Sequence, residues 1–263
     1  MNIIYFPSKL GQIKNGLQNS YKILNSIISS KINIVNCNNS CKNDLYNNLN
    51  NLYITNQYFD KKINIGGDHS MSIATVAHSL NVHKNLKVIW FDAHPDINTY
   101  YRSKTKNLHG MPLSYLSGLD YSLRFHFINN KLDLNNLLYI GIRDIDIFEQ
   151  EIINKYNISY ITPHDFNNNP EYCLQKINNF INTDPVHLSF DVDCMDPNII
   201  PCTGTKVING LMIDQTKFIL DNLYDKNIVN IDIAEINFLL GDNKEQKTTI
   251  NNFLYLFDKY LYL

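Results

Sequence analysis

Apolar residues occur along the chain in short runs that alternate with longer amphipathic segments. The runs are bounded by Asn, Gly or Pro, whereas the longer segments repeat apolar residues at the spacing of a helix. The runs predict strands near Ile3–Phe6, Lys31–Val35, Lys62–Ile65, Leu86–Phe91, Leu137–Ile142, Ser159–Ile161, Val186–Phe190 and Ile228–Ile233. The amphipathic segments predict helices within Asp44–Phe59, Ser70–Leu80, Glu149–Tyr156, Leu211–Leu223 and Ile250–Leu261.

The alternation of strands and helices is typical of repeated βα units. Leu86–Phe91 is almost wholly apolar, as in a strand that helices cover on both faces of a parallel sheet. Neither an internal repeat nor a Pro-rich linker divides the chain. We therefore expect the α/β class, with a single domain over residues 1–263, three α/β/α layers and a mainly parallel sheet of about eight strands.

Composition excludes several classes of partner. The chain has 263 residues, a net charge of −2 and a pI near 6.4, so it lacks the basic surface that nucleic-acid binding requires. Its longest apolar run is Phe253–Phe257, which is far too short to cross a membrane. The odd count of five cysteines favours free thiols. Since the N-terminus has no secretory pattern, we expect a cytoplasmic protein.

Ionisable side chains follow four of the predicted strands. They occur in the segments Gly66-Gly-Asp-His-Ser70, Asp92-Ala-His-Pro-Asp96, Asp191-Val-Asp193 and Ala234-Glu-Ile-Asn237. Sites in parallel sheets form beyond the carboxyl ends of the strands. In an extended backbone, alternate residues face the same side, so the acidic and imidazole groups within each segment can converge. We expect these groups to meet at one edge of the sheet.

So many carboxylates in one crevice predict a metal site. Without a cation they would repel each other and take up protons. The six candidate ligands, which suit two ions with shared carboxylates better than one zinc, are His69, Asp92, His94, Asp96, Asp191 and Asp193. Oxygen-rich ligands favour Mn²⁺ over Zn²⁺ or Cu²⁺. Each motif also has a structural alternative, such as helix capping by the two aspartates after Phe190, but the coincidence of four motifs favours the metal site.

Six motifs, taken in order, resemble those of the ureohydrolases, the family of arginases and agmatinases. They are GGDHS, DAHPDIN, HGMP, SFDVDCMDP, TGT and EIN, and the resemblance extends from about Gly11 to Asn237. The chain is most similar to the arginases, because Asp92–Asn98 is followed by Thr105 and then by Leu108–Pro112. Ile140–Asp146, with Glu149 three residues further on, is a further match.

The resemblance implies two Mn²⁺ ions per chain. One ion would be bound by His69, Asp92, Asp96 and Asp191, and the other by His94, Asp92, Asp191 and Asp193, so that Asp92 and Asp191 bridge. The implied reaction is hydrolysis of L-arginine to L-ornithine and urea by attack of a metal-bridging hydroxide on the guanidinium carbon. The ions would lower the pKa of their shared water from ~15.7 toward neutrality.

The resemblance also implies roles for side chains beside the metals. Asp96 would accept a hydrogen bond from the nucleophile and then pass on its proton. His109 would be the proton shuttle, although it has an alternative structural role in the HGMP turn. Glu235 would pair with the guanidinium group, and Thr205 would hold Glu235 in place.

At the other end of the substrate, the resemblance implies contacts that distinguish arginine from agmatine, which lacks the α-carboxylate. Asn98 and Thr105 would bind the α-carboxylate, while the α-amino group would meet Asp144, Asp146 and Glu149. Their alternative role is that of ordinary polar loop residues. Because similar proteins form trimers or hexamers, we also expect a homo-oligomer.

Some positions depart from the family pattern without removing a ligand: Pro95, Lys206, Asn209, Phe238, and Thr105 where Ser is more usual. The segment Lys9–Gly16 is expected to be a structural turn.

Two other hypotheses stay open. A ureohydrolase for agmatine or another guanidino acid would act without the substrate's carboxylate, and a non-catalytic member would have lost metal ligands, all of which are present here.

Overall fold

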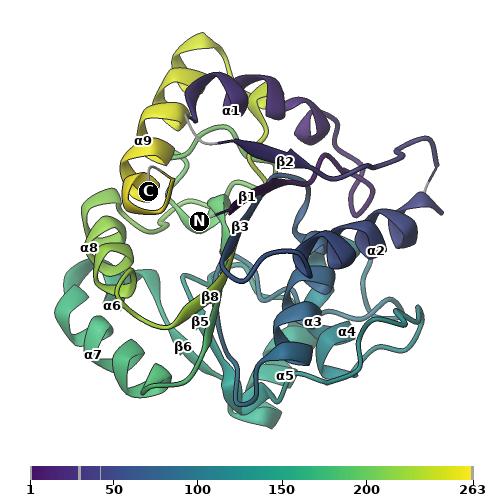
Figure 1. Ribbon diagram of the computed structural model, residues 1–263. Helices are drawn as coiled ribbons and strands as arrows, with labels where there is room; N and C mark the ends of the chain where they lie inside the picture. Colours follow the sequence, from purple (N-terminus) through teal and green to yellow (C-terminus); the bar gives the residue numbers. More distant parts are fainter. Residues whose placement is uncertain (1, 29–30, 42, 262–263) are drawn as a thin grey trace.

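A parallel sheet forms the centre of the protein in a computed structural model that describes residues 2–28, 31–41 and 43–261 (Figure 1). Within these residues there are eight strands: β1 (Asn2–Tyr5), β2 (Ile32–Ile34), β3 (Lys62–Ile65), β4 (Lys87–Phe91), β5 (Leu137–Ile140), β6 (Ser159–Ile161), β7 (Val186–Asp191) and β8 (Ile228–Ala234). Their order is β2-β1-β3-β8-β7-β4-β5-β6, and every adjacent pair is parallel. This confirms the predicted parallel sheet.

Helices cover both faces of the sheet (Figure 1). One layer contains α1 (Tyr21–Ile27), α6 (Pro163–Asn168), α7 (Pro170–Ile181), α8 (Ile213–Leu223) and α9 (Asn243–Leu261). The other contains α2 (Asp44–Asn56), α3 (Ser72–Val82), α4 (Pro112–Ser117) and α5 (Ile147–Tyr156). A separate hydrophobic cluster lies between the sheet and each layer. The three-layer α/β/α prediction is therefore confirmed.

The central strand β4 shows why its sequence is apolar throughout. Ile89 and Phe91 pack into one cluster, whereas Val88 and Trp90 pack into the other. Burial of each such side chain contributes roughly 1.5–3 kcal/mol. Because both faces are packed, the carboxyl end of β4 is held firmly against its neighbours β5 and β7.

Four helices were not predicted from the sequence: α1, α4, α6 and α7. The last three begin at Pro112, Pro163 and Pro170, each within the first helical turn. Proline interrupts a helix interior, but it is compatible with the first turn, where its missing N–H is not needed. The final helix also begins earlier than predicted, at Asn243; its first turns are polar and carry no apolar repeat that could predict them.

No helix in the described ranges has the length and apolar character needed to span a membrane. The five cysteines are unpaired, and Cys173, Cys194 and Cys202 are buried. Burial raises the pKa of these three thiols, so they remain protonated and unreactive at neutral pH.

Candidate metal centre and active site

The predicted site residues follow the carboxyl ends of five adjacent strands. His69 follows β3, Asp92 follows β4, Asp146 follows β5, and Glu235 follows β8, while Asp191 is the last residue of β7. These strands lie side by side in the order β3-β8-β7-β4-β5. The topology thus brings together residues that are far apart in the sequence, at the edge where the sequence predicts chemistry.

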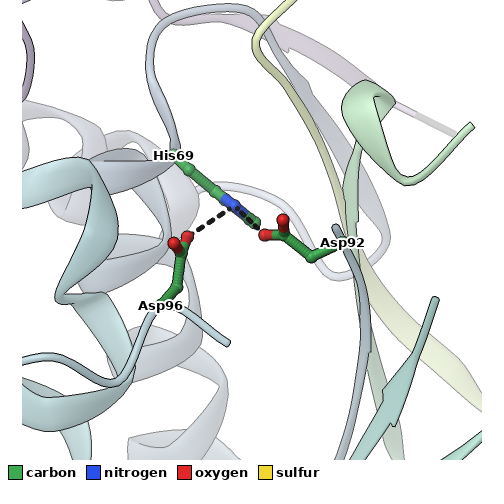
Figure 2. Close-up of side chains that lie close together, drawn as sticks. All are labelled: His69, Asp92 and Asp96. Atoms are coloured by element: carbon green, nitrogen blue, oxygen red, sulfur yellow. Dashed lines mark ion pairs between the residues drawn. The ribbon is translucent and has the colours of Figure 1, made fainter. Parts of the chain in front are cut away.

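His69 lies at the centre of a first ligand cluster (Figure 2). Its Nδ1 atom lies 3.0 Å from Asp92 Oδ2, 3.0 Å from Asp96 Oδ2 and 3.4 Å from Asp191 Oδ2. The imidazole ring stacks on the indole ring of Trp90, with centroids 4.2 Å apart. The four side chains predicted to bind one ion therefore converge on a single point.

His94 forms a second cluster beside the first. Its Nδ1 atom lies 3.3 Å from Asp92 Oδ1 and 3.2 Å from Asp193 Oδ2. The two oxygens of Asp92 thus face different histidines, Oδ2 toward His69 and Oδ1 toward His94. This is the arrangement that a carboxylate shared between two cations requires.

The bare clusters have an electrostatic conflict that a cation would remove. Burial and the negative charge of Asp92 raise the pKa of Asp96 to about 7, and burial with the charges of Asp193 and Asp92 raises the pKa of Asp191 well above its usual range. Nδ1 of His69 is buried and has no hydrogen-bond partner of good geometry among the described residues. An unsatisfied imidazole nitrogen among carboxylate oxygens fits a divalent ion of the Mn²⁺ type.

A tight turn after β3 places His69. Gly66 and Gly67 have φ angles of +89° and +74°, and a Cβ on Gly67 would lie 2.8 Å from the carbonyl oxygen of Phe6. Only glycine accommodates both the left-handed backbone and this close approach. Asp68 then caps the following turn by accepting a hydrogen bond from the backbone N–H of Ser70.

Glu235, which is buried, pairs with the partly buried His109 at the side of the metal centre. His109 Nδ1 lies 3.1 Å from Glu235 Oε1, which also accepts a hydrogen bond from the backbone N–H of His69. Burial lowers the pKa of His109, but the contact with Glu235 outweighs it and raises the pKa to about 9. His109 therefore carries a proton at neutral pH.

Gln12 is a site residue that sequence analysis missed. Its Nε2 atom donates a 2.6 Å hydrogen bond to Glu235 Oε2. The segment Lys9–Gly16 was predicted to be a structural turn, and it also reaches the site: Gly11 N donates to Asp68 Oδ2 at 2.8 Å, and His109 N donates to Gly11 O at 3.1 Å. No local pattern marks Gln12, because its partner is 223 positions away in the sequence.

The hydrogen-bond partner of Thr205 is not Glu235, the residue that it was predicted to hold. Its hydroxyl donates a 2.7 Å hydrogen bond to Asp193 Oδ2. The carboxylate of Glu235 is instead held by His109, Gln12 and the backbone of His69. The TGT loop therefore supports a predicted metal ligand, and the expected Thr205–Glu235 contact is wrong.

The residues predicted to bind the amino-acid end of the substrate have different surroundings. Asp146 is exposed and accepts a 3.0 Å hydrogen bond from Asn98 Nδ2. Glu149 is buried, and its two oxygens accept the backbone N–H groups of Ile97 and Asp146. Burial and the charge of Asp96 raise the pKa of Glu149 to about 8. Glu149 thus joins the start of α5 to the Asp96 loop.

Asp144, also predicted to meet the α-amino group, is largely exposed, and its Oδ2 lies 3.6 Å from His94 Nε2.

A cleft opens onto both ligand clusters. Nine predicted site residues line it, together with Ser103, Asn107 and Gly110: His94, Asp96, Asn98, Thr105, His109, Asp146, Glu149, Asp191 and Thr205. The cleft therefore connects the metal centre with the residues predicted to recognise the substrate's amino-acid end.

Sequence comparisons match this architecture to one family. The Arginase family matches residues 11–256. An arginase from Schizosaccharomyces pombe is 39% identical over 197 residues, which cover 72% of this chain and 61% of the relative. An arginase from Staphylococcus aureus (strain COL) is 35% identical over 189 residues, with 68% and 61% covered. The matched part thus spans 61% of the length of each relative.

Solved structures agree over nearly the whole chain. An Entamoeba histolytica arginase in complex with L-ornithine has a TM-score of 0.91 and 27% identity, covering 100% of this chain and 98% of that one. A Bacillus subtilis arginase has a TM-score of 0.83 and 28% identity, with 97% of each chain covered. Together with the sequence matches, these similarities show that the chain belongs to the Arginase family.

Proposed function

We propose that this protein is an arginase that hydrolyses L-arginine to L-ornithine and urea and holds two Mn²⁺ ions per chain. The observation that carries the proposal is the pair of ligand clusters that share Asp92 beside a cleft lined by polar residues. The family match and the ornithine complex of the Entamoeba histolytica relative support it.

Six side chains would hold the ions. His69, Asp92, Asp96 and Asp191 would bind one, and His94 with Asp193 would complete the other beside the shared aspartates. When bound, the ions polarise water, lower its pKa and so supply a nucleophile at neutral pH. The four carboxylates offset the charge of two divalent ions, so the cleft keeps no large positive charge that would repel a guanidinium group.

The protein's own residues would orient the substrate and move protons. Glu235 presents a buried carboxylate that can pair with a planar guanidinium, and Gln12 and His109 hold its orientation. His109, whose pKa the contact with Glu235 raises to about 9, would give a proton to the departing δ-amine as the carbon–nitrogen bond breaks. Asp96, which contacts His69 and lines the cleft, would accept a hydrogen bond from the attacking water and then pass on its proton. Urea and ornithine then leave through the cleft.

Recognition of the amino-acid end would distinguish this protein from agmatinases. Asn98 and Thr105 line the cleft where the α-carboxylate would bind, and Asp146 offers a negative charge to the α-amino group. Asp144, beside His94, would also meet the α-amino group. Glu149 would act chiefly by holding the Asp96 loop through the backbone N–H of Ile97. Thr205 would contribute through Asp193.

The test is urea release after Mn²⁺ activation, with L-arginine and agmatine assayed side by side and total metal counted on the same sample. We expect turnover of arginine but not agmatine, with about two ions per chain. A preference for agmatine would keep the metal centre and overturn the proposed roles of Asn98, Thr105 and Asp146. No turnover of either substrate with metal bound would favour another guanidino acid or a non-catalytic protein.

We further propose that residues 1–263 form one domain, because a single sheet runs through the described residues from β1 to β8. Five unpaired cysteines suit the reducing cytoplasm, which is our proposed location. Assembly into a homo-oligomer, a trimer or hexamer, stays a prediction of the family resemblance.

A further inference from the structure

A chain of buried polar groups extends behind His69, on the side of the ring away from Asp92 and Asp96. His69 Nε2 lies 2.8 Å from Ser189 Oγ on β7. Ser189 Oγ lies 3.2 Å from Ser72 Oγ at the start of α3, and Ser72 Oγ donates a 2.9 Å hydrogen bond to Asp232 Oδ2 on β8. All four residues are fully buried. We call His69–Ser189–Ser72–Asp232 the relay.

Asp232 anchors the far end of the relay as a pure acceptor. Besides Ser72, it accepts hydrogen bonds from Thr75 Oγ1, from Asn64 Nδ2 at 2.9 Å and from His187 Nε2 at 3.0 Å. Burial opposes ionisation, but His187 and the two hydroxyls outweigh it and hold the pKa of Asp232 below its usual value. An ionised carboxylate has no proton to donate, so every group around it must point a hydrogen toward it.

This acceptor fixes the direction of each hydrogen bond in the relay. A serine hydroxyl has one hydrogen, and that of Ser72 is used on Asp232. Ser72 can then only accept from Ser189, so the single hydrogen of Ser189 is used in turn. Ser189 can therefore only accept from His69 Nε2, which must carry a hydrogen. The lone pair available for a metal is consequently on Nδ1, the atom that faces the carboxylates.

We propose that Asp232, acting through Ser72 and Ser189, is a positioning residue that holds His69 with its hydrogen on Nε2 and its Nδ1 lone pair toward the metal centre. The inference rests on the proposed function in taking Mn²⁺ as the ion and in counting two ions in its test. Hydrogen bonds from a ligating imidazole to a fixed acceptor raise its basicity and orient its ring. The relay supplies such an acceptor from three separate elements, β7, α3 and β8.

The relay reaches only one of the two ligand clusters. His94 contacts Asp92, Asp193 and Asp144, and none of these belongs to the relay. Loss of the relay should therefore weaken one Mn²⁺ ion and spare the other. A merely structural role of the buried serines would loosen both clusters alike, because they share Asp92.

The test is a Mn²⁺ titration of the full chain, followed by calorimetry and by electron paramagnetic resonance, which distinguishes a coupled pair of ions from a single one. Ser72→Ala removes the central link of the relay. We expect about 10- to 100-fold weaker binding of one ion, with loss of the coupled-pair signal. Thr75→Val is the matched control, since it also removes a donor to Asp232 from α3 but lies outside the relay. It should keep both affinities.

Ser189→Ala breaks the next link and provides a second variant on a different element if Ser72→Ala does not fold. The double variant should bind Mn²⁺ no more weakly than the single variant with the lower affinity, because both substitutions interrupt the same relay. Wild-type affinities in Ser72→Ala, or an equal loss in Thr75→Val, would overturn the inference. The wild-type ion count tests the proposed function separately: one ion that Ser72→Ala weakens supports the relay without a binuclear centre, and no ion at all overturns both.

Discussion

Asp96 and Glu235 both occupy the left-handed region of backbone conformation, with φ angles of 51° and 66°. For residues other than glycine, this conformation costs on the order of 1–3 kcal/mol and persists only where surrounding contacts impose it. Here the backbone N–H of Glu235 donates to Gly67 O, and Asp96 O accepts from the N–H of Leu113. Of these two residues, Asp96 lines the cleft and Glu235 contacts His109, which also lines it, so both strained positions belong to the site.

Asp146 provides a test of substrate recognition by a single side chain. It lies in the cleft but outside both ligand clusters. We expect Asp146→Ala to raise KM for L-arginine about 10- to 100-fold, the loss of one charged hydrogen bond, while bound metal stays at the wild-type level. The control is Glu151→Ala, which deletes an exposed carboxylate on α5 and should change neither KM nor bound metal. Unchanged KM, or loss of metal, in Asp146→Ala would contradict the assigned role.

The residues that could be predicted from sequence are those placed by one strand and its end. Asp92, His94 and Asp96 follow one apolar strand directly, so their gathering at its end could be predicted, although a bend at 93–94 and the left-handed backbone of Asp96 replace the expected extended chain. Gln12, Ser72 and Asp232 could not be predicted in this way, because their partners come from other elements through packing. The misplaced Thr205 contact has the same cause, since the loop's final position depends on tertiary structure.

At the scale of elements, a buried polar corner joins β3, α2 and α3. Lys62 on β3 is buried, and its ammonium group donates to the carbonyl oxygens of Asn56, the last residue of α2, and of Phe59 just after it. His78 on α3 lies 3.4 Å from the same ammonium group. Burial, followed by the charge of Lys62, lowers the pKa of His78 to about 4. The corner therefore favours a neutral imidazole.

This corner predicts a pH dependence of stability. In the unfolded chain His78 has a pKa near ~6.5, so below that pH the unfolded state binds more protons than the folded state. The stability present above pH ~6.5 is then lost as the pH falls toward the folded-state pKa, by at most about 3 kcal/mol. Urea unfolding of wild type and His78→Gln in chelator should show this loss in wild type only. Parallel curves for the two proteins would contradict the prediction.

At the scale of the whole molecule, the metal centre joins parts of the chain that belong to different βα units. His69 follows β3, Asp92 follows β4, and Asp191 ends β7, so three loops converge on one point. Four carboxylates lie within these clusters, although the net charge of the whole chain is only −2. Without a cation, repulsion among these buried groups opposes the packing that brings the strand ends together.

Metal removal should therefore lower the stability of the entire fold and not only the activity. Ions that bind the folded state alone stabilise it by about 2.7 kcal/mol per site at a hundredfold excess over Kd. Since each kcal/mol shifts the Tm of a chain of this size by roughly 2–4 °C, two ions should raise the Tm by about 10 °C or more over the protein in chelator.

Asp191→Ala is the control: it loses a ligand near His69, so Mn²⁺ should barely change its Tm, and it should lose tightly bound metal and activity together. A wild-type Tm that is the same in chelator and in Mn²⁺ would show that the strand ends hold their arrangement without ions, and that the clusters do not contribute to the cohesion of the fold.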